Sequence, residues 1–125
     1  MRNSKVSVLI VDDHAYFAKS MKNMLDEVEE IDSVDLALNF NDGLRMLEAQ
    51  QHDVVLLDIS MPGKNGLDLL QEIQNKSLDC TVIVLSNMSA NYYRQECKRL
   101  GASYFLDKSC EFDLVPGIIS SVQLN

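Results

Sequence analysis

The sequence predicts an α/β domain built on an open, doubly wound, five-stranded parallel sheet with five flanking helices. Short apolar runs of strand length alternate with segments of helical periodicity along the chain. This alternation is typical of a parallel sheet with right-handed crossovers. The runs at 6–11, 54–57 and 82–85 are almost continuously apolar, as are strands covered on both faces. No linker or repeat interrupts the pattern, so residues 1–125 are expected to form one domain.

Two further strands are expected at 34–38, where apolar residues alternate with polar or small ones as in an outer strand, and at 104–106. The segments between the strands carry apolar residues at helical spacing. These residues are Phe17, Met21, Met24, Leu25 and Val28; Leu44 and Leu47; Leu67, Leu70 and Ile73; Ala90, Tyr93, Cys97 and Leu100; and Val115, Ile118, Ile119 and Val122.

Local signals place some of the helix ends. Asn41 is a candidate N-cap for the second helix, and Gly101 is expected to end the fourth. Because proline is tolerated only in a first turn, Pro116 predicts that the last helix begins near Leu114.

Composition excludes several classes of function. A net charge of −8 argues against binding of nucleic acid or of an anionic membrane surface, since both need clustered Lys and Arg. No apolar stretch approaches the ~18 residues of a membrane span and no targeting segment is evident, so a cytoplasmic protein is expected. Cys80, Cys97 and Cys110 lack metal-ligand spacing, which favours reduced thiols in or near the core.

The candidate site lies where the strands end. Asp12 and Asp13 follow the first strand, Asp58 the third, Ser86 the fourth and Lys108 the fifth. In open α/β sheets the ligand site lies beyond the carboxyl ends of the strands. Taken singly, each residue has an ordinary explanation, such as a helix cap, a turn residue or a surface charge. Their joint placement is what points to a site.

The chemistry of this set favours phosphoryl transfer. Two carboxylates ~4 Å apart repel by about 4 kcal/mol at an effective dielectric near 20, so three of them favour a hard cation such as Mg²⁺. Lys108 adds an ammonium and Ser86 a hydroxyl donor. Together they could surround a phosphoryl group, with Asp58 as the nucleophile that forms an acyl phosphate.

The segment from Val6 to about Val122 resembles the receiver domain of two-component response regulators. The run Leu57-Asp-Ile-Ser-Met-Pro-Gly-Lys-Asn-Gly66 fits the phosphoacceptor loop of that family, and Asp12-Asp13, Ser86 and Lys108 fit its other motifs. The resemblance implies a flavodoxin-like fold with strand order 2-1-3-4-5.

The resemblance also implies roles. Asp58 would accept the phosphoryl group, and Mg²⁺, with Mn²⁺ as the alternative, would be held by Asp13, by Asp58, by the Ser60 carbonyl and, through water, by Asp12. Ser86 and Phe105 would switch conformation together. The donor would be a sensor histidine kinase or a phosphotransfer protein. The chain would catalyse only its own phosphorylation and dephosphorylation, so it is not expected to be an enzyme in the usual sense.

The chain departs from the family pattern at two places. Asn87 stands where a small residue is usual, and Asn87 and Met88 are candidates for tuning the lifetime of the phosphoryl group. Ser109 follows the lysine where proline is frequent, a form that resembles receivers with DNA-binding output domains. No output domain follows Asn125, so we expect a single-domain regulator or one part of a longer protein.

The output would leave through the face that runs from Ala90 through Phe105 to the last helix. The receiving partner would be a downstream protein, an output domain or a second copy in a phosphorylation-dependent homodimer. The residues considered for this face are Tyr92, Arg94, Lys98 and Asp107.

Two alternatives stay open on the sequence. The first is a receiver fold that binds partners without phosphorylation, although none of its cluster residues is lost. The second is an aspartate-nucleophile phosphatase. Such enzymes have an Asp-x-Asp after the first strand, whereas this chain has two adjacent acids there.

Overall fold

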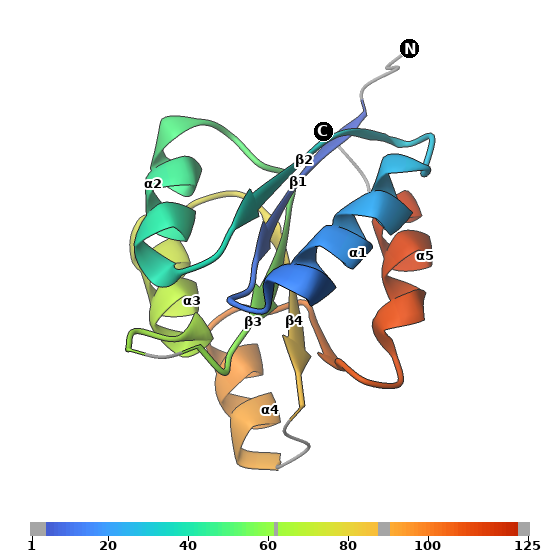
Figure 1. Cartoon of the computed structure of the whole chain (residues 1–125). Coiled ribbons are helices and arrows are strands. Elements are labelled where there is room, and N and C mark those ends of the chain that lie inside the picture. The colour runs from blue at the N-terminus through green and yellow to red at the C-terminus, as the bar shows by residue number, and fades with distance from the viewer. Residues whose placement is uncertain (1–4, 62, 88–90, 123–125) are drawn as a thin grey trace.

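The computed structural model describes residues 5–61, 63–87 and 91–122. Strands and helices alternate throughout (Figure 1). They are β1 (Val6–Val11), α1 (Ala15–Asp26), β2 (Ile31–Ala37), α2 (Phe40–Ala49), β3 (Val54–Asp58), α3 (Gly66–Asn75), β4 (Thr81–Ser86), α4 (Asn91–Arg99), β5 (Tyr104–Asp107), the 3₁₀ turn η1 (Phe112–Leu114) and α5 (Val115–Ser120).

All neighbouring strands are parallel, and their order is β2-β1-β3-β4-β5. This confirms the predicted fold class and strand order. The register brings the carboxyl ends of the central strands to one edge: Asp58 pairs with Leu85, and Ser86 pairs with Asp107. The candidate site residues therefore leave the sheet at the same edge.

The sheet is covered on both faces, with α1 and α5 on one side and α2, α3 and α4 on the other (Figure 1). Alternate side chains of β3 enter the two cores: Val55 and Leu57 pack beneath α2–α4, and Val54 and Leu56 beneath α1 and α5. All four are at most 1% exposed. A strand buried on both faces explains the continuous apolar run in the sequence.

The connection from β2 to α2 differs in detail from the expectation. Asn39, not Asn41, caps α2, because its side chain accepts a hydrogen bond from the Asp42 amide. Phe40 then begins the helix and is buried. Because α2 is capped earlier than expected, β2 ends at Ala37 and not at residue 38. Leu38 lies outside the sheet and is 42% exposed.

The other predicted helix ends agree with the structure. Gly101, at φ +99°, lies two residues after Arg99, the last residue of α4, and a left-handed residue there suits glycine. Pro116 lies in the first turn of α5, which begins at Val115 after η1. Within residues 5–61, 63–87 and 91–122, no helix has the length and apolar character needed to span a membrane.

The prediction that the thiols lie in or near the core is right for two of them. Cys97 is buried and Cys80 is partly buried, but Cys110 is exposed, in the turn after β5. In that turn Asp107 Oδ1 accepts hydrogen bonds from the Ser109 amide and hydroxyl. The short strand before it gives no sequence signal for which way the next side chain points.

Candidate functional site

An acidic pocket lies at the carboxyl edge of the sheet. Asp12 follows β1, Asp58 ends β3, and Lys108 follows β5; they are 2%, 2% and 6% exposed. Lys108 Nζ lies 2.8 Å from Asp12 Oδ2 and 3.3 Å from Asp58 Oδ2. The structure thus brings together residues 46 and 50 positions apart, as the strand-end pattern predicts.

Local structure holds Asp58 in place. The Ser60 amide donates a hydrogen bond of 3.0 Å to Asp58 Oδ1, so the chain turns back over the carboxylate. Asn65 then caps α3 in a reciprocal capping box with Asp68. The returning helix approaches so closely that a Cβ added at Gly66 would lie 2.5 Å from the Asp58 carbonyl oxygen. Glycine at this position is therefore a requirement of the loop.

The pocket holds more negative than positive charge. The carboxylates of Asp12, Asp13 and Asp58 face the single ammonium of Lys108. Burial raises the pKa of Asp12, and the neighbouring Asp58 carboxylate adds to the rise. The hydrogen bonds from Lys108 and from the His14 amide oppose it without cancelling it. Excess negative charge in a buried pocket favours a bound cation.

His14 is a site residue that the sequence reasoning missed. Its Nδ1 lies 3.1 Å from Asp12 Oδ1, 3.3 Å from Asp13 Oδ1, 3.6 Å from Asp58 Oδ2 and 3.0 Å from Lys108 Nζ. The available signal was a ligand-type residue placed directly after the acidic pair. Sequence alone does not show whether such a ring turns inward, and as the N-cap of α1 it could equally have faced the helix.

The donor set fits a divalent cation. Asp12, Asp13, His14 and Asp58 each offer one ligand atom, and these atoms all lie within 4.8 Å of one another. Within the described residues, Asp13 Oδ1 is buried and accepts no hydrogen bond. Carboxylate oxygens are ligands suited to Mg²⁺. Ser60 lies against the same pocket, and a role for its carbonyl stays a prediction.

The two residues assigned to switching lie on β4, which pairs with the strand of Asp58, and on β5, the next strand along. Ser86, 1% exposed, ends β4 one position beyond the register partner of Asp58. Phe105, on β5, pairs with Val84 of β4 and packs against the core beneath α2–α4. The Arg94 guanidinium lies 4.8 Å from the centre of the Phe105 ring, so α4 and β5 are joined by a cation–π contact.

Two hollows adjoin the pocket. His14, Tyr16, Phe17, Asn87 and Lys108 are among the residues that line one of about 340 Å³. Asn87 is exposed there, on the rim predicted for it, whereas Met88 lies outside the described residues.

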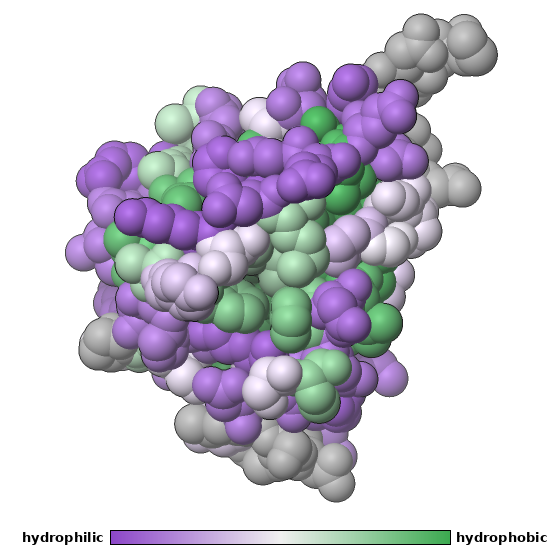
Figure 2. Space-filling view, turned by 45° about the vertical axis from the view of Figure 1, so that its right-hand side comes forward, coloured by the Kyte–Doolittle hydropathy of each residue, from purple (hydrophilic) through white to green (hydrophobic). Residues whose placement is uncertain are grey.

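The second hollow, also about 340 Å³, lies between α1 and η1 and has a mainly apolar lining that includes Met24 and Phe112. Tyr16, which lines both hollows, is 87% exposed. Figure 2 shows apolar patches among hydrophilic side chains on the face turned toward the viewer.

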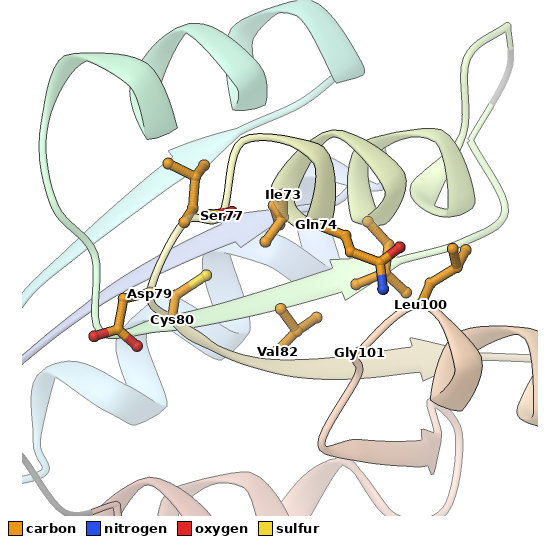
Figure 3. A pocket seen from close by; sticks show the side chains of 10 residues that line it. Ile73, Gln74, Ser77, Asp79, Cys80, Val82, Leu100 and Gly101 are labelled. Atoms are coloured by element: carbon orange, nitrogen blue, oxygen red, sulfur yellow. The ribbon is translucent and has the colours of Figure 1, made fainter.

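A separate cavity of about 430 Å³ lies at the opposite, amino end of β4 (Figure 3). Leu70, Ile73, Val82 and Leu100 supply apolar walls, and Cys80 lies at its edge. Burial raises the pKa of the Cys80 thiol to about 11, so it is protonated and weakly nucleophilic at neutral pH. No cluster of ligand atoms was found there among the described residues, and the cavity is not the candidate site.

Fold and pocket together define a doubly wound α/β domain with an acidic site beside a buried lysine. Residues 8–119 match the family model described as "Response regulator receiver domain". The chain belongs to this family, a signalling module of two-component systems.

Relatives of known sequence are longer than this chain. It is 37% identical over 110 residues to the transcriptional regulatory protein MalR of Bacillus subtilis, covering 86% of this chain and 46% of the relative. It is 34% identical over 106 residues to a protein-glutamate methylesterase/protein-glutamine glutaminase of Clostridium acetobutylicum, covering 83% and 31%. The chain therefore spans between about a third and a half of the length of these two relatives.

A solved relative covers most of this chain. The response regulator TrrA of Thermotoga maritima, in complex with Mg(2+)-BeF, is 31% identical with a TM-score of 0.78, over 90% of this chain and 95% of that one. The receiver of the Francisella response regulator 1452 has a TM-score of 0.84 at 24% identity and supports the fold alone.

Proposed function

We propose that Asp58 accepts a phosphoryl group from a sensor histidine kinase or a phosphotransfer protein, in the presence of Mg²⁺ or, as the alternative ion, Mn²⁺. The observation that carries the proposal is a buried carboxylate with Lys108 Nζ 3.3 Å from its Oδ2 and an acidic pair within ligand distance. The relative TrrA, solved with Mg(2+)-BeF, supports the choice of cation.

The residues divide the work of transfer. The Asp58–phosphorus bond forms as the donor's phosphorus–nitrogen bond breaks, and the released imidazole nitrogen keeps the electron pair. Lys108, already beside Asp58, offsets charge on the phosphoryl oxygens. A cation held by Asp12, Asp13, Asp58 and the Ser60 carbonyl supplies further charge neutralisation when bound.

The output follows from the same geometry. The Ser86 hydroxyl donates to the new phosphoryl group, and Phe105, on the next strand, changes rotamer with it. Because the Phe105 ring packs under Arg94, its movement alters the surface made by α4, β5 and α5. A downstream protein, an output domain or a second copy in a phosphorylation-dependent homodimer reads this surface.

Removal of the phosphoryl group is governed by the rim. A water must approach opposite Asp58, and Asn87 lines the hollow beside Lys108 that adjoins the pocket. The amide of Asn87 should narrow the path of this water and slow hydrolysis, and an influence of Met88 on the lifetime stays a prediction. The lifetime of the phosphoryl group in Asn87→Ala should therefore be shorter than in the wild type. An equal or longer lifetime contradicts this role.

The wider assignment follows from these roles. Residues 1–125 act as one cytoplasmic receiver domain that binds neither nucleic acid nor membrane, consistent with the net charge of −8. Its only catalysis concerns its own phosphorylation and dephosphorylation.

The test is phosphorylation by a small phosphoramidate or acyl phosphate, followed by intact-mass measurement. The wild type should gain one base-labile phosphoryl group when Mg²⁺ is present and little in EDTA. Asp58→Asn should gain none, while Asp79→Asn, which changes an exposed acid at the far end of the sheet, should behave as the wild type. Folded wild type that is never modified would favour the phosphorylation-independent binding module instead.

A further inference from the structure

The imidazole of His14 enters the acidic pocket. The side chain is 56% exposed, so the ring is not forced into the pocket by burial. Although His14 is the N-cap of α1, its side chain makes no hydrogen bond to the helix. Its Nδ1 instead lies between carboxylate oxygens of Asp12, Asp13 and Asp58, at 3.1, 3.3 and 3.6 Å. The ring nitrogen and the acid oxygens thus point into one small space.

We propose that His14 Nδ1 is a ligand of the divalent cation, so that the site prefers nitrogen-binding transition-metal ions over Mg²⁺. The proposal rests on the cation site of the proposed function and adds a specificity-determining residue to it. A site of carboxylates and carbonyls alone suits Mg²⁺, whereas an imidazole ligand favours first-row transition metals, with affinity rising from Mn²⁺ to Ni²⁺.

The hydrogen bonding of Nδ1 supports ligation. Lys108 Nζ, 3.0 Å from Nδ1, can only donate to it. Asp12 Oδ1, 3.1 Å from Nδ1, already accepts a hydrogen bond of 2.8 Å from the His14 amide. This pattern favours a lone pair on Nδ1, and a cation that takes the place of the Lys108 ammonium there would bind that lone pair together with the carboxylate oxygens.

The arrangement also leaves a position to be filled. Asp13 Oδ1 is buried and, within the described part of the chain, accepts no hydrogen bond. It lies 3.3 Å from Nδ1, so a ligand that engages one atom is within reach of the other. The other histidine, His52, is buried beside Asp35 and does not belong to this cluster of ligand atoms.

The test is metal affinity measured by calorimetry for Mg²⁺, Mn²⁺ and Ni²⁺ at one fixed pH. His14→Ala and His14→Gln should lower Ni²⁺ affinity by at least about tenfold. Loss of a residue that only supports a metal ligand already lowers metal affinity by about 10–100-fold, and loss of a ligand itself should cost no less. Mn²⁺ affinity should fall less and Mg²⁺ affinity least. Tyr16→Ala, which changes the most exposed aromatic of the same rim, should leave all three affinities unchanged.

A spectroscopic readout makes the assignment direct. With ¹⁵N-labelled histidine and bound Mn²⁺, pulsed electron paramagnetic resonance should detect a coupled nitrogen in the wild type and none in His14→Ala. An unchanged ratio of Ni²⁺ to Mg²⁺ affinity overturns the proposal. So does a rise in all three affinities on removing the ring, because His14 would then compete with the cation instead of binding it.

The failure of this inference is distinguishable from that of the proposed function. If the wild type binds Mg²⁺ and Asp13→Asn does not, but His14→Ala leaves the metal preference intact, only the role of His14 is wrong. If neither the wild type nor Asp13→Asn binds any of the three ions, the cation site itself is refuted.

Discussion

Replacement of Asp58 by asparagine should stabilise the metal-free protein. Asparagine keeps the shape of the side chain and an oxygen for the Ser60 amide, but removes one charge from the pocket. In the wild type the ligand oxygen of Asp58 lies within 4.8 Å of those of Asp12 and Asp13. The repulsion between the Asp58 carboxylate and each of the other two is therefore at least about 3.5 kcal/mol at an effective dielectric near 20. The lost attraction to Lys108 at 3.3 Å is about 5 kcal/mol on the same scale.

Removal of two repulsions outweighs loss of one attraction, so Asp58→Asn should gain about 2 kcal/mol in free energy of unfolding. The assay is urea denaturation in EDTA, where the midpoint should rise without a change in slope. The matched control is Asp32→Asn, which removes an exposed acid from β2 and should change stability by less than about 0.5 kcal/mol. If Asp58→Asn is no more stable than the wild type, the pocket is not under-neutralised and the electrostatic reasoning fails.

Three further outcomes follow from packing and burial. Gly66→Ala places a Cβ 2.5 Å from the Asp58 carbonyl oxygen and should lower the free energy of unfolding by about 1–3 kcal/mol. Gly117→Ala, where a Cβ meets nothing within 4 Å, should raise the free energy of unfolding by about 0.5–1 kcal/mol. A urea midpoint for Gly66→Ala that is equal to or above that of Gly117→Ala would contradict the close approach of α3 to the Asp58 carbonyl. Burial raises the pKa of the Cys80 and Cys97 thiols from 9.0 to about 11. Between these two pH values the unfolded chain loses thiol protons that the folded state keeps, so the free energy of unfolding should fall as pH rises. Replacing both cysteines by alanine should flatten that pH profile, and an unchanged slope would rule out the thiols as its cause.

The fold was predictable because several local patterns agree. Continuous apolar runs identify buried parallel strands, and the residues that stop them lie where the sheet ends. Asp12, Asp58 and Lys108 were therefore found from strand positions alone. Their proximity follows from the register, which needs no knowledge of side-chain conformation.

The remaining details depend on tertiary packing. Asn39 and Asn41 are equally good caps, and only the burial of Phe40 as the first helical residue selects the former. The direction of the His14 ring depends on the charges of Asp58, at the end of β3, and of Lys108, just after β5, which lie far away in sequence. No local pattern carries that information.

The most direct test of the central claim is to locate the modified residue. Borohydride reduces an aspartyl phosphate to homoserine, so protein treated with a small phosphodonor and Mg²⁺ can be reduced, digested and sequenced by mass spectrometry. Homoserine at position 58 alone is the predicted result. Homoserine at Asp12 or Asp13, or none at any position in folded protein with its cation bound, would contradict the assignment of Asp58 as phosphoacceptor.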